Sequence, residues 1–490
     1  MLKLTDKTLL RADSYVNGTW TAARANARFP VTNPATGETI AEVADLDAQD
    51  TRAAIDAAYE AQPAWRAKTA KERAILMRKW FELIMANQED LAQIMTAEQG
   101  KPLAETRGEV AYGASFIEWF AEEGKRVYGD VIPTNAPNRR IIVTKQPIGV
   151  VSAITPWNFP NAMITRKCAP ALAAGCSFLI KPAAETPLSA TALAELAHRA
   201  GIPKGVFNVI TSKQASKVGL ELTQNPKIAK FSFTGSTPIG KQLMAQCATT
   251  VKKVSLELGG NAPFIVFDDA DLDAAVEGAM ASKYRNMGQT CVCANRLLVQ
   301  EGVYDAFAQK LEARVRQMKV GNGADDGVVQ GPLITMAAVE KVEKLIADGV
   351  AKGAKIAVGG KRHALGGTYF EPTVIENATP AMEFAREEIF GPVAALYRFK
   401  DEAEAIAMAN DTEYGLAAYF YARDIGRIWR VAEALEYGII GINEGIISTE
   451  VAPFGGMKES GIGREGSKYG IEDFLEIKYL ALGGLGKEQK

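Results

Sequence analysis

Residues 150–180, VVSAITPWNFPNAMITRKCAPALAAGCSFLI, decide the fold of this chain. Residues 150–155 are an apolar run that predicts a strand, residues 163–174 are typical of a helix, and residues 177–180 predict a second strand. Short strands that are apolar throughout and are separated by a helix are typical of a parallel sheet that is covered on both faces. The stretch therefore predicts an α/β fold.

The same alternation of strand and helix continues as far as Leu258. Helices are predicted at 187–200, 216–224 and 237–247, and strands at 206–211, 228–234 and 251–258. We predict that residues 1–126 and 148–257 form one doubly wound domain, with flanking helices at 51–61 and 71–97.

A second alternating series follows the pair Gly259–Gly260. It starts with a predicted strand at 263–267 and a helix at 272–285. It continues with predicted elements at 295–300, 303–318, 392–399, 402–410, 416–421, 425–435 and 438–443. We therefore predict a second doubly wound domain, residues 258–466.

Two stretches fit neither series. Residues 127–147 predict a hairpin with a turn-like centre, and residues 467–486 contain a lone strand at 469–482. Isolated hairpins are rarely stable in water, so these stretches are candidates for pairing with another subunit. We predict a small β arm that assembles the chain into a homo-oligomer, a dimer or a tetramer.

The composition is that of an ordinary soluble globular protein, with 47% hydrophobic and 23% charged residues and a net charge of −2. Such a balance predicts no nucleic-acid partner and no membrane partner. Charged residues interrupt the first ten positions, which argues against a signal peptide and favours the cytoplasm. Two histidines, and five cysteines without a CxxC pair, argue against a histidine-dependent hydrolase, a disulfide framework and a metal site.

Two glycine motifs invite comparison with dinucleotide sites. Residues 461–466 match GxGxxG, but no strand precedes them, so we interpret them as a loop. Residues 235–241, GSTPIGK, follow a predicted strand and open a helix whose N-terminus favours an anion. Because Gln242 replaces the Ser or Thr of a P-loop, a dinucleotide pyrophosphate fits better than a transferred phosphate. An ordinary strand–helix turn is the alternative.

Four side chains in or beside predicted loops could carry chemistry. Cys291, in the loop GQTCVC, could be exposed and reactive, although a lone cysteine is usually structural. Glu257 ends an apolar strand, where a buried carboxylate suits a general base. The amide of Asn158 follows the first parallel strand and can donate to an oxyanion. Lys181 stands at a strand end where doubly wound sheets bind ligands.

Taken together, the motifs of this chain resemble the aldehyde dehydrogenase superfamily. The shared motifs are TPWNFP (155–160), KPA (181–183), FTGS (233–236), LELGG (256–260), GQTC (288–291), EEIFGP (387–392) and PFGG (453–456). The resemblance covers nearly the whole chain. QTCVCANR (289–296) and GREGSKYGIEDFLEIKYL (463–480) look close to the members that oxidise succinic semialdehyde.

The resemblance implies NAD(P)-dependent oxidation of succinic semialdehyde to succinate, with glutaric semialdehyde or another aldehyde as the alternative substrate. Cys291 would form a thiohemiacetal whose oxyanion is held by Asn158 and by the backbone N–H of Cys291. After hydride transfer, Glu257 would activate the water that hydrolyses the thioester. The implied cofactor site comprises Thr155, Pro156, Trp157, Lys181, Ala184, Gly235, Ser236, Leu258, Glu388 and Phe390.

The residue three positions after the KPA lysine bears on cofactor choice. Many NAD-preferring relatives have a glutamate there that bonds the ribose hydroxyls, whereas this chain has Ala184. Without that carboxylate, the 2′-phosphate of NADP meets less repulsion, although Glu185 is adjacent. We predict that NADP is preferred and that NAD is the alternative cofactor.

Other residues bear on substrate choice and regulation. Arg166 and Arg285 match arginines that bind the distal carboxylate of succinic semialdehyde in similar enzymes, and Ser448 matches a hydroxyl beside them. Glu444, if it faces the pocket, would pair with an arginine or repel the substrate and so favour another aldehyde. Cys293 is a candidate redox partner of the nucleophile, with passive packing as the alternative.

Three rival readings remain in view: a thioester-forming hydrolase, a CoA-acylating dehydrogenase and a protein that kept the fold without activity. Glu257 argues for hydrolysis of the thioester by water. The sequence contains no evident CoA site. The full set of Asn158, Lys181, Glu257, Cys291 and Glu388 argues against loss of activity.

Overall fold

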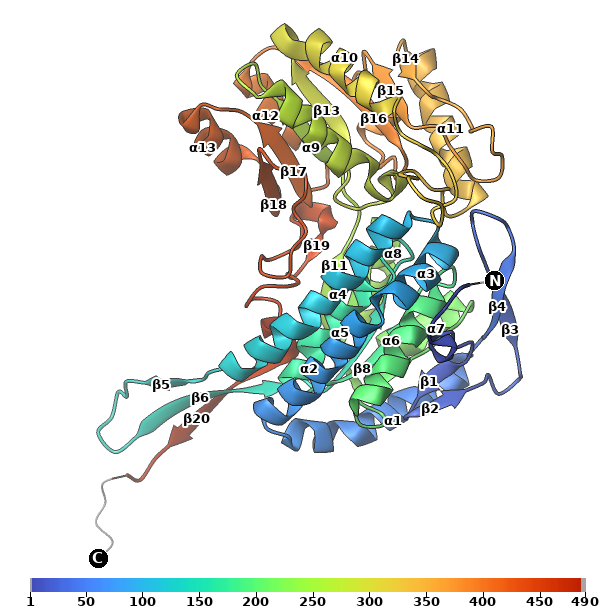
Figure 1. Cartoon of the computed structure of the whole chain (residues 1–490). Helices are drawn as coiled ribbons and strands as arrows, with labels where there is room; N and C mark the ends of the chain where they lie inside the picture. Colours follow the sequence, from blue (N-terminus) through green and yellow to red (C-terminus); the bar gives the residue numbers. More distant parts are fainter. Residues whose placement is uncertain (1, 486–490) are drawn as a thin grey trace, which may run out of the picture.

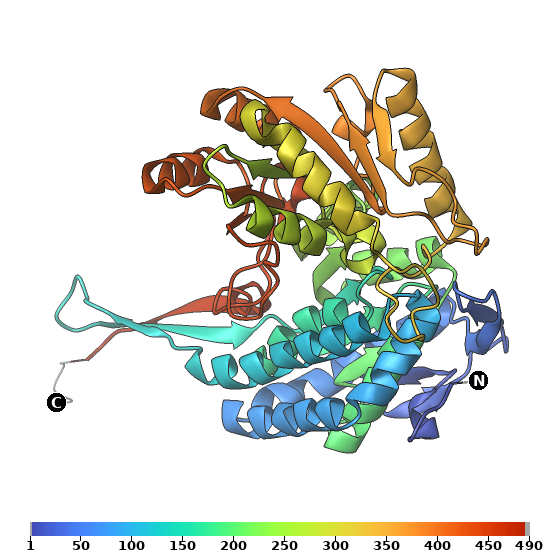
Figure 2. The same ribbon diagram turned by 45° about the horizontal axis from the view of Figure 1, so that its top comes forward.

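The computed structural model describes residues 2–485, so residue 486 of the predicted arm lies outside the described residues. Most of the chain forms two α/β domains, one above the other in Figure 1, and a slender arm projects from the lower one. The lower, first domain carries an eight-stranded sheet, and the upper, second domain a seven-stranded sheet. Figure 2 shows the arm clear of both domains. The predicted fold class, two parallel-sheet domains with a β arm, is confirmed.

The first sheet grows outward from the strands of residues 150–180. Its five central strands are parallel, in the order β11 (Lys253–Glu257), β10 (Ile228–Thr234), β7 (Val150–Ile154), β8 (Ser177–Lys181) and β9 (Phe207–Val209). Antiparallel strands β1 (Ser14–Val16) and β2 (Thr19–Thr21) extend one edge, and β19 (Gly461–Ile462) extends the other. Because the chain returns to the far side of β7 for β10, the carboxyl ends of these two strands flank a switch point where such sheets bind ligands.

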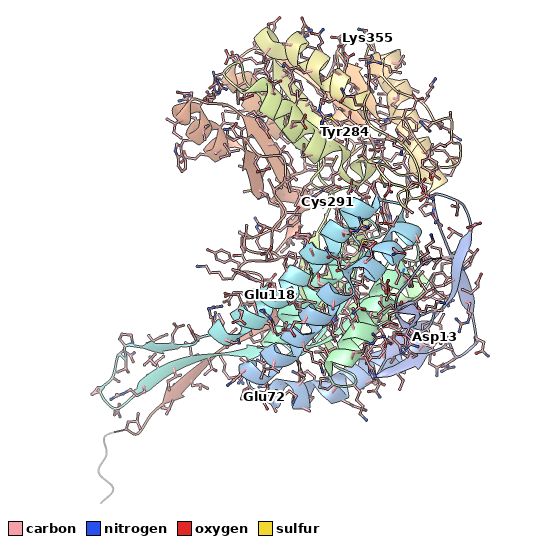
Figure 3. The ribbon with its side chains drawn as sticks, in the orientation of Figure 1. Asp13, Glu72, Glu118, Tyr284, Cys291 and Lys355 are labelled. Atoms are coloured by element: carbon pink, nitrogen blue, oxygen red, sulfur yellow. The ribbon has the colours of Figure 1, made fainter. Side chains whose placement is uncertain are left out.

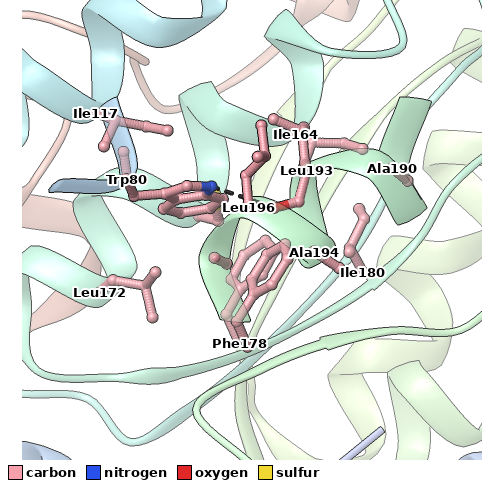
Figure 4. Packing of buried hydrophobic residues seen from close by; sticks show 14 of the residues in the cluster. Trp80, Ile117, Ile164, Leu172, Phe178, Ile180, Ala190, Leu193, Ala194 and Leu196 are labelled. Atoms are coloured by element: carbon pink, nitrogen blue, oxygen red, sulfur yellow. Dashed lines mark hydrogen bonds between the residues drawn. The ribbon is translucent and has the colours of Figure 1, made fainter. Parts of the chain in front are cut away.

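Helices cover both faces of this sheet because alternate strand residues enter two different cores. On β8, Phe178 and Ile180 enter one core and Leu179 the other. The helices of the first core are α2 (Ala70–Ala86), α3 (Gln88–Gln99), α4 (Leu103–Glu123), α5 (Ala162–Ala174) and α6 (Pro187–Ala200), and those of the second are α1 (Ala48–Ala67), α7 (Ala215–Gln224) and α8 (Thr237–Cys247). In the first core the indole N–H of Trp80 donates to the Leu193 carbonyl at 3.1 Å (Figure 4), so this buried polar group is satisfied.

The second sheet repeats the doubly wound pattern. Its strands run in the order β14 (Lys355–Val358), β15 (Thr373–Glu376), β16 (Val393–Phe399), β13 (Ala294–Gln300), β12 (Ala262–Val266), β17 (Ala417–Tyr421) and β18 (Ile439–Ile442). All neighbours are parallel except β14 and β15. The helices are α9 (Leu272–Tyr284), α10 (Tyr304–Val315), α11 (Met336–Ala351), α12 (Glu402–Asn410) and α13 (Ile425–Ala434). Within residues 2–485, no helix has the length and apolarity of a membrane span.

The chain passes between the two domains at two adjacent places. β11 ends at Glu257, and Leu258–Asn261 lead directly into β12 of the other sheet. The chain returns just before β19, where Gly461 pairs with Glu257 and the Leu258 N–H donates to the Ser460 carbonyl at 2.9 Å. The two crossings are therefore hydrogen-bonded to each other beside Glu257.

The arm is a three-stranded antiparallel sheet in the order β20 (Leu475–Leu482), β6 (Arg140–Pro147) and β5 (Asp130–Ile132). The hairpin predicted within residues 127–147 is present as β5 and β6. The C-terminal strand predicted to stand alone does not: it pairs with β6 along its whole length. A third strand satisfies backbone groups that a two-stranded hairpin would leave to water.

Some elements go beyond the predictions, including α4, α11 and the hairpin of β3 (Arg28–Thr32) with β4 (Thr39–Ala44). Gly108 and Gly113 weaken the helical signal of α4, which packs against α2 and α5. α11 follows the capping residue Thr335 and buries apolar residues three or four positions apart, a signal that could have identified it. The helix predicted at 71–97 is two helices that meet at Asn87.

Candidate active site

A cavity of about 290 Å³ surrounds Cys291 and takes its walls from both domains. Figure 3 places Cys291 where the two domains meet. From the first domain come residues of α4, α5 and the loop before α5, and from the second come residues of two loops. The lining residues are Glu105, Gly108, Glu109, Tyr112, Phe159, Met163, Arg166, Arg285, Thr290, Cys291, Val292, Ile446, Ser448 and Phe454.

Cys291 lies between the turn Arg285–Gly288 and strand β13. It is half-buried, whereas the other four cysteines are buried, and all five are free thiols. Burial raises the pKa of the Cys291 thiol to about 12, although the positive charge of Arg166 favours the thiolate. The nucleophile is therefore held as a neutral thiol that needs a base to take its proton.

Asn158, at the end of β7, is buried against the loop that carries the nucleophile. Its Nδ2 donates to the Gln289 carbonyl at 3.0 Å. Its own backbone carbonyl accepts from Lys101 Nζ at 2.7 Å and from Asn286 Nδ2 at 2.9 Å. The amide group is thus fixed against the nucleophile loop at Gln289, two residues before Cys291, although Asn158 is not among the residues that line the cavity. Its second N–H is left to donate to another acceptor.

Glu257, the last residue of β11, is 3% exposed, and its Oε2 has no hydrogen-bond partner among residues 2–485. Burial and the neighbouring carboxylate of Glu465 raise the pKa of Glu257 well above its usual range. A carboxyl group with a raised pKa and a free oxygen is suited to accept and release a proton near neutral pH.

Glu465 is a functional neighbour that the sequence reasoning missed. It lies in the glycine motif that we interpreted as a loop, and its carboxylate binds two buried cations. Arg166 Nε donates to its Oε2 at 2.8 Å, and Lys167 Nζ donates to its Oε1. Burial opposes ionisation, but Lys167 and Arg166 lower the pKa of Glu465, so it stays anionic beside Glu257.

The two predicted substrate arginines differ in their surroundings. The Arg166 guanidinium is buried, engaged by Glu465, and lies 4.0 Å from the ring centre of Phe454. The Arg285 guanidinium lies 5.4 Å from the ring centre of Phe159 and forms no ion pair with any carboxylate of the described residues. Both line the cavity together with Ser448. Among the described residues, Nη2 of Arg166 also lacks a hydrogen-bond partner, so free donors do not separate the two arginines. What sets Arg285 apart is that no carboxylate of the described residues forms an ion pair with it, which leaves its charge for an incoming carboxylate.

Glu444 and Cys293 do not line the cavity. Glu444 is exposed, and its carboxylate accepts from the backbone N–H of Ile446 at 2.8 Å. It therefore does not oppose a substrate carboxylate inside the cavity. Cys293 is buried, with its thiol 3.2 Å from the Lys283 carbonyl.

The predicted cofactor residues gather around the switch point of the first sheet. Lys181 ends β8, and burial lowers the pKa of its ammonium. This ammonium donates to the Pro182 carbonyl at 3.2 Å and makes no other hydrogen bond with a described residue. Helix α8 starts after Ser236 without a side-chain cap, which leaves its first N–H groups free for an anion. Glu388 accepts from the Gly260 N–H at 3.3 Å, and burial raises the pKa of this carboxyl to about 7.

The remaining predicted cofactor residues include three that lie near Lys181 in space rather than in the sequence: Thr155 donates its backbone N–H to the Lys181 carbonyl at 3.2 Å, and Pro156 and Trp157 follow it. The rings of Trp157 and Phe390 meet edge to face at 5.6 Å, and Phe390 adopts a positive φ of 54°. Thr155 is buried, and its hydroxyl has no hydrogen-bond partner in the part of the chain that the structure describes. Ala184 is half-buried against the first core. Pro156, Gly235 and Leu258 lie beside them at the ends of β7, β10 and β11. The uncapped helix N-terminus and the lysine can bind the phosphates and hydroxyls of a dinucleotide, and the carboxylate can accept hydrogen bonds from its ribose hydroxyls. These groups together fit a dinucleotide.

The chain is similar to known proteins along nearly its whole length. The chain is 65% identical to a glutarate-semialdehyde dehydrogenase of Pseudomonas aeruginosa over 99% of this chain and 100% of the relative. It is 64% identical to the NADP(+) succinate-semialdehyde dehydrogenase of Escherichia coli over 98% and 100%. The crystal structure of an Escherichia coli NADP-dependent enzyme superposes with a TM-score of 0.97 at 64% identity and covers 98% of this chain and 100% of that one.

The model of the aldehyde dehydrogenase family matches residues 20–480, which span both domains and nearly all of the arm. The motifs that suggested this family therefore belong to a match along almost the whole chain. This protein belongs to the aldehyde dehydrogenase family.

Proposed function

We propose that this protein oxidises an aldehyde that carries a carboxylate at its far end, with succinic semialdehyde as the substrate and NADP as the cofactor. The observation that carries the proposal is the guanidinium of Arg285, which lines the cavity of Cys291 and forms no ion pair within residues 2–485. Glutaric semialdehyde is the second candidate, because relatives that are 65% and 64% identical are named for these two aldehydes.

Cys291, Asn158 and Glu257 have different roles in the proposed reaction. The Cys291 thiol first loses its proton to a base, for which the carboxylate of Glu257 is the candidate, and Glu257 passes this proton on to solvent. The resulting thiolate attacks the aldehyde carbon, and the Asn158 amide and the Cys291 N–H donate to the oxyanion of the thiohemiacetal. A nicotinamide dinucleotide held near Lys181, Ser236 and Glu388 would supply the acceptor for the hydride of the aldehyde carbon. Glu257 then takes a proton from water, whose oxygen attacks the thioester. The carbon–sulfur bond breaks, the acid is released and Cys291 regains its thiolate.

The reaction is tested with the wild-type protein by following the absorbance of the reduced nicotinamide. The substrates are three-, four- and five-carbon semialdehydes and uncharged butanal, each with NADP and with NAD. We expect the highest kcat/KM for succinic semialdehyde with NADP. Equal kcat/KM for butanal and the semialdehydes would refute the proposed substrate class.

The Arg285→Ala variant should separate the two kinds of substrate. Because a hydrogen-bonded ion pair with the substrate carboxylate is lost, kcat/KM for succinic semialdehyde should fall about 10- to 100-fold. The value for butanal should stay within about threefold, since butanal has no group for the guanidinium. Arg314→Ala, at an exposed arginine of α10 paired with Glu277, is the matched control. Equal losses for both aldehydes would contradict the role.

Arg166 is the second cation that lines the cavity around Cys291. Its charge is shared with Glu465, so we propose that it raises the potential of the cavity and orients Glu465 rather than binding the substrate carboxylate alone. Ser448 supplies a hydroxyl on the same lining. Cys293 as a redox partner of Cys291 stays a prediction.

The Ala184→Glu variant should change the cofactor preference. A carboxylate at this position, beside exposed Glu185, would repel the 2′-phosphate of NADP and offer hydrogen bonds to the ribose hydroxyls of NAD. We expect kcat/KM with NADP to fall about tenfold or more while the value with NAD holds or rises. Ala184→Gln is the neutral control of nearly equal size. A parallel loss with both cofactors would argue against this account.

We further propose that the arm makes the protein a homo-oligomer, either a dimer or a tetramer. Large apolar side chains on its strands are exposed, among them Val131 at 78% and Ile477 at 70%. Exposed apolar surface of this extent usually meets a partner. The domain boundaries at 126, 147, 257 and 466 and the cytoplasmic location stay predictions of the sequence.

A further inference from the structure

The turn just before the nucleophile has an unusual backbone. Asn286, Met287 and Gly288 follow one another with φ values of 51°, 57° and 73°. Left-handed conformations disfavour side chains other than glycine, and asparagine tolerates them best. Such a turn persists only when its surroundings hold it in place. It matters here because the residue before it is Arg285 and Cys291 follows shortly after it.

Contacts from the first domain hold this turn. Glu105 Oε2, on α4, accepts the backbone N–H of Asn286 at 2.8 Å. Gln99 Nε2, at the end of α3, donates to the side-chain oxygen of Asn286 at 2.9 Å. The amide of Asn286 in turn donates to the Asn158 carbonyl at 2.9 Å. One fully buried asparagine therefore links Glu105 to the nucleophile loop, through the Gln289 carbonyl at 3.2 Å, and to the backbone of Asn158.

Glu105 also brings a negative charge to the cavity that contains Arg285. Two glutamates line this cavity, and the other, Glu109, is engaged by Lys101 Nζ at 2.5 Å and by the Asn161 N–H at 2.9 Å. Glu105 is half-buried, and the Oε1 of Glu105 accepts no hydrogen bond from the described residues. Burial raises the pKa of Glu105, opposed by the charges of Lys101 and Arg285.

We propose that Glu105 is a positioning residue with two separable effects. As a hydrogen-bond acceptor it holds the turn Arg285–Gly288, and through Asn286 the oxyanion amide, so that Cys291 and Asn158 keep their relative geometry. As an anion it competes with the substrate carboxylate for the field of Arg285. The second effect rests on the proposed function, whereas the first requires only aldehyde oxidation by Cys291.

Three substitutions separate the two effects. Glu105→Gln keeps an acceptor oxygen of the same reach and removes the charge. Glu105→Asp keeps the charge and shortens the reach to the Asn286 N–H. Glu105→Ala removes both. Glu118, an exposed glutamate on the same helix that pairs with Arg78, gives the matched controls Glu118→Gln and Glu118→Ala. Each variant is assayed with succinic semialdehyde and with butanal, and its thermal midpoint is recorded.

The acceptor effect predicts the order of kcat with either aldehyde. Glu105→Ala and Glu105→Asp should lose about 10- to 100-fold, since the buried N–H loses its partner, whereas Glu105→Gln stays within about threefold of wild type. Alkylation of Cys291 by iodoacetamide should slow in the same order. Equal kcat in the Gln and Ala variants, or wild-type kcat in the Asp variant, would overturn the positioning role. If the Ala variant fails to fold, the Gln–Asp comparison decides.

The charge effect predicts a different pattern in KM. Glu105→Gln should lower KM for succinic semialdehyde severalfold and leave KM for butanal unchanged, while Glu105→Asp should leave both unchanged. An unchanged or higher KM for the semialdehyde in Glu105→Gln would overturn the charge effect. A wild-type enzyme that does not distinguish the two aldehydes would refute the proposed function and the charge effect together, and the kcat order would still decide the positioning role.

Discussion

Replacement of Cys291 by alanine is expected to abolish aldehyde oxidation, with kcat lowered by about 10⁴-fold or more. The reason is that the hydride leaves only after the aldehyde carbon is joined to sulfur, and the other four thiols are buried. The measurement is the absorbance of the reduced nicotinamide under saturating aldehyde. Binding of NADP, followed by thermal shift, should remain, because the predicted cofactor residues lie elsewhere.

Cys247→Ala is the matched control for this variant. Cys247 is a buried cysteine of α8, and its replacement should leave kcat within about twofold. Activity of the Cys291→Ala protein above about a hundredth of wild type would assign the nucleophile to another group.

Replacement of Glu257 by glutamine should separate the two halves of the reaction. Steady-state kcat is expected to fall about 10²- to 10⁴-fold, because no group remains to take the proton of the attacking water. In rapid mixing at high pH, where the Cys291 thiolate forms without help, one equivalent of reduced nicotinamide should still appear. A thioester should then accumulate on the enzyme, visible as added mass on the intact protein.

The role of Glu257 as a base also predicts how kcat changes with pH. The raised pKa of Glu257 keeps its carboxyl protonated at low pH, and only the ionised form accepts a proton. Wild-type kcat should therefore rise with pH through the pKa of Glu257, and this limb should vanish in Glu257→Gln. Glu118→Gln should retain the limb. A profile unchanged by Glu257→Gln would show that another group is the base.

Much of the fold could be predicted because it depends on local patterns. The strands Val150–Ile154 and Ile228–Thr234 are apolar throughout because both faces of the sheet are covered, and this makes them visible in the sequence. Both arm strands, Leu475–Leu482 and Arg140–Pro147, lie in stretches that the sequence predicts to be extended, but their pairing with each other does not follow from it, since strand pairing over such a separation leaves no local trace.

The site residues also differ in whether local sequence motifs can identify them. Cys291, Asn158 and Glu257 lie in short motifs near strand ends, so they can be predicted as site residues from the sequence. The pairing of Arg166 with Glu465 joins positions 299 residues apart, and this contact is what distinguishes Arg166 from Arg285. Two arginines that look equivalent in the sequence therefore have different surroundings in the fold.

The two crossings between the domains have a mechanical consequence. Both pass beside Glu257, where the Leu258 N–H donates to the Ser460 carbonyl and Gly461 pairs with the strand end. The other contacts between the domains, such as those of Asn286 with Gln99 and Glu105, are hydrogen bonds that can break and form again. Only the main chain at these crossings joins the domains covalently among the described residues. If the domains move apart, Glu257 is therefore displaced less than residues that lie far from the crossings.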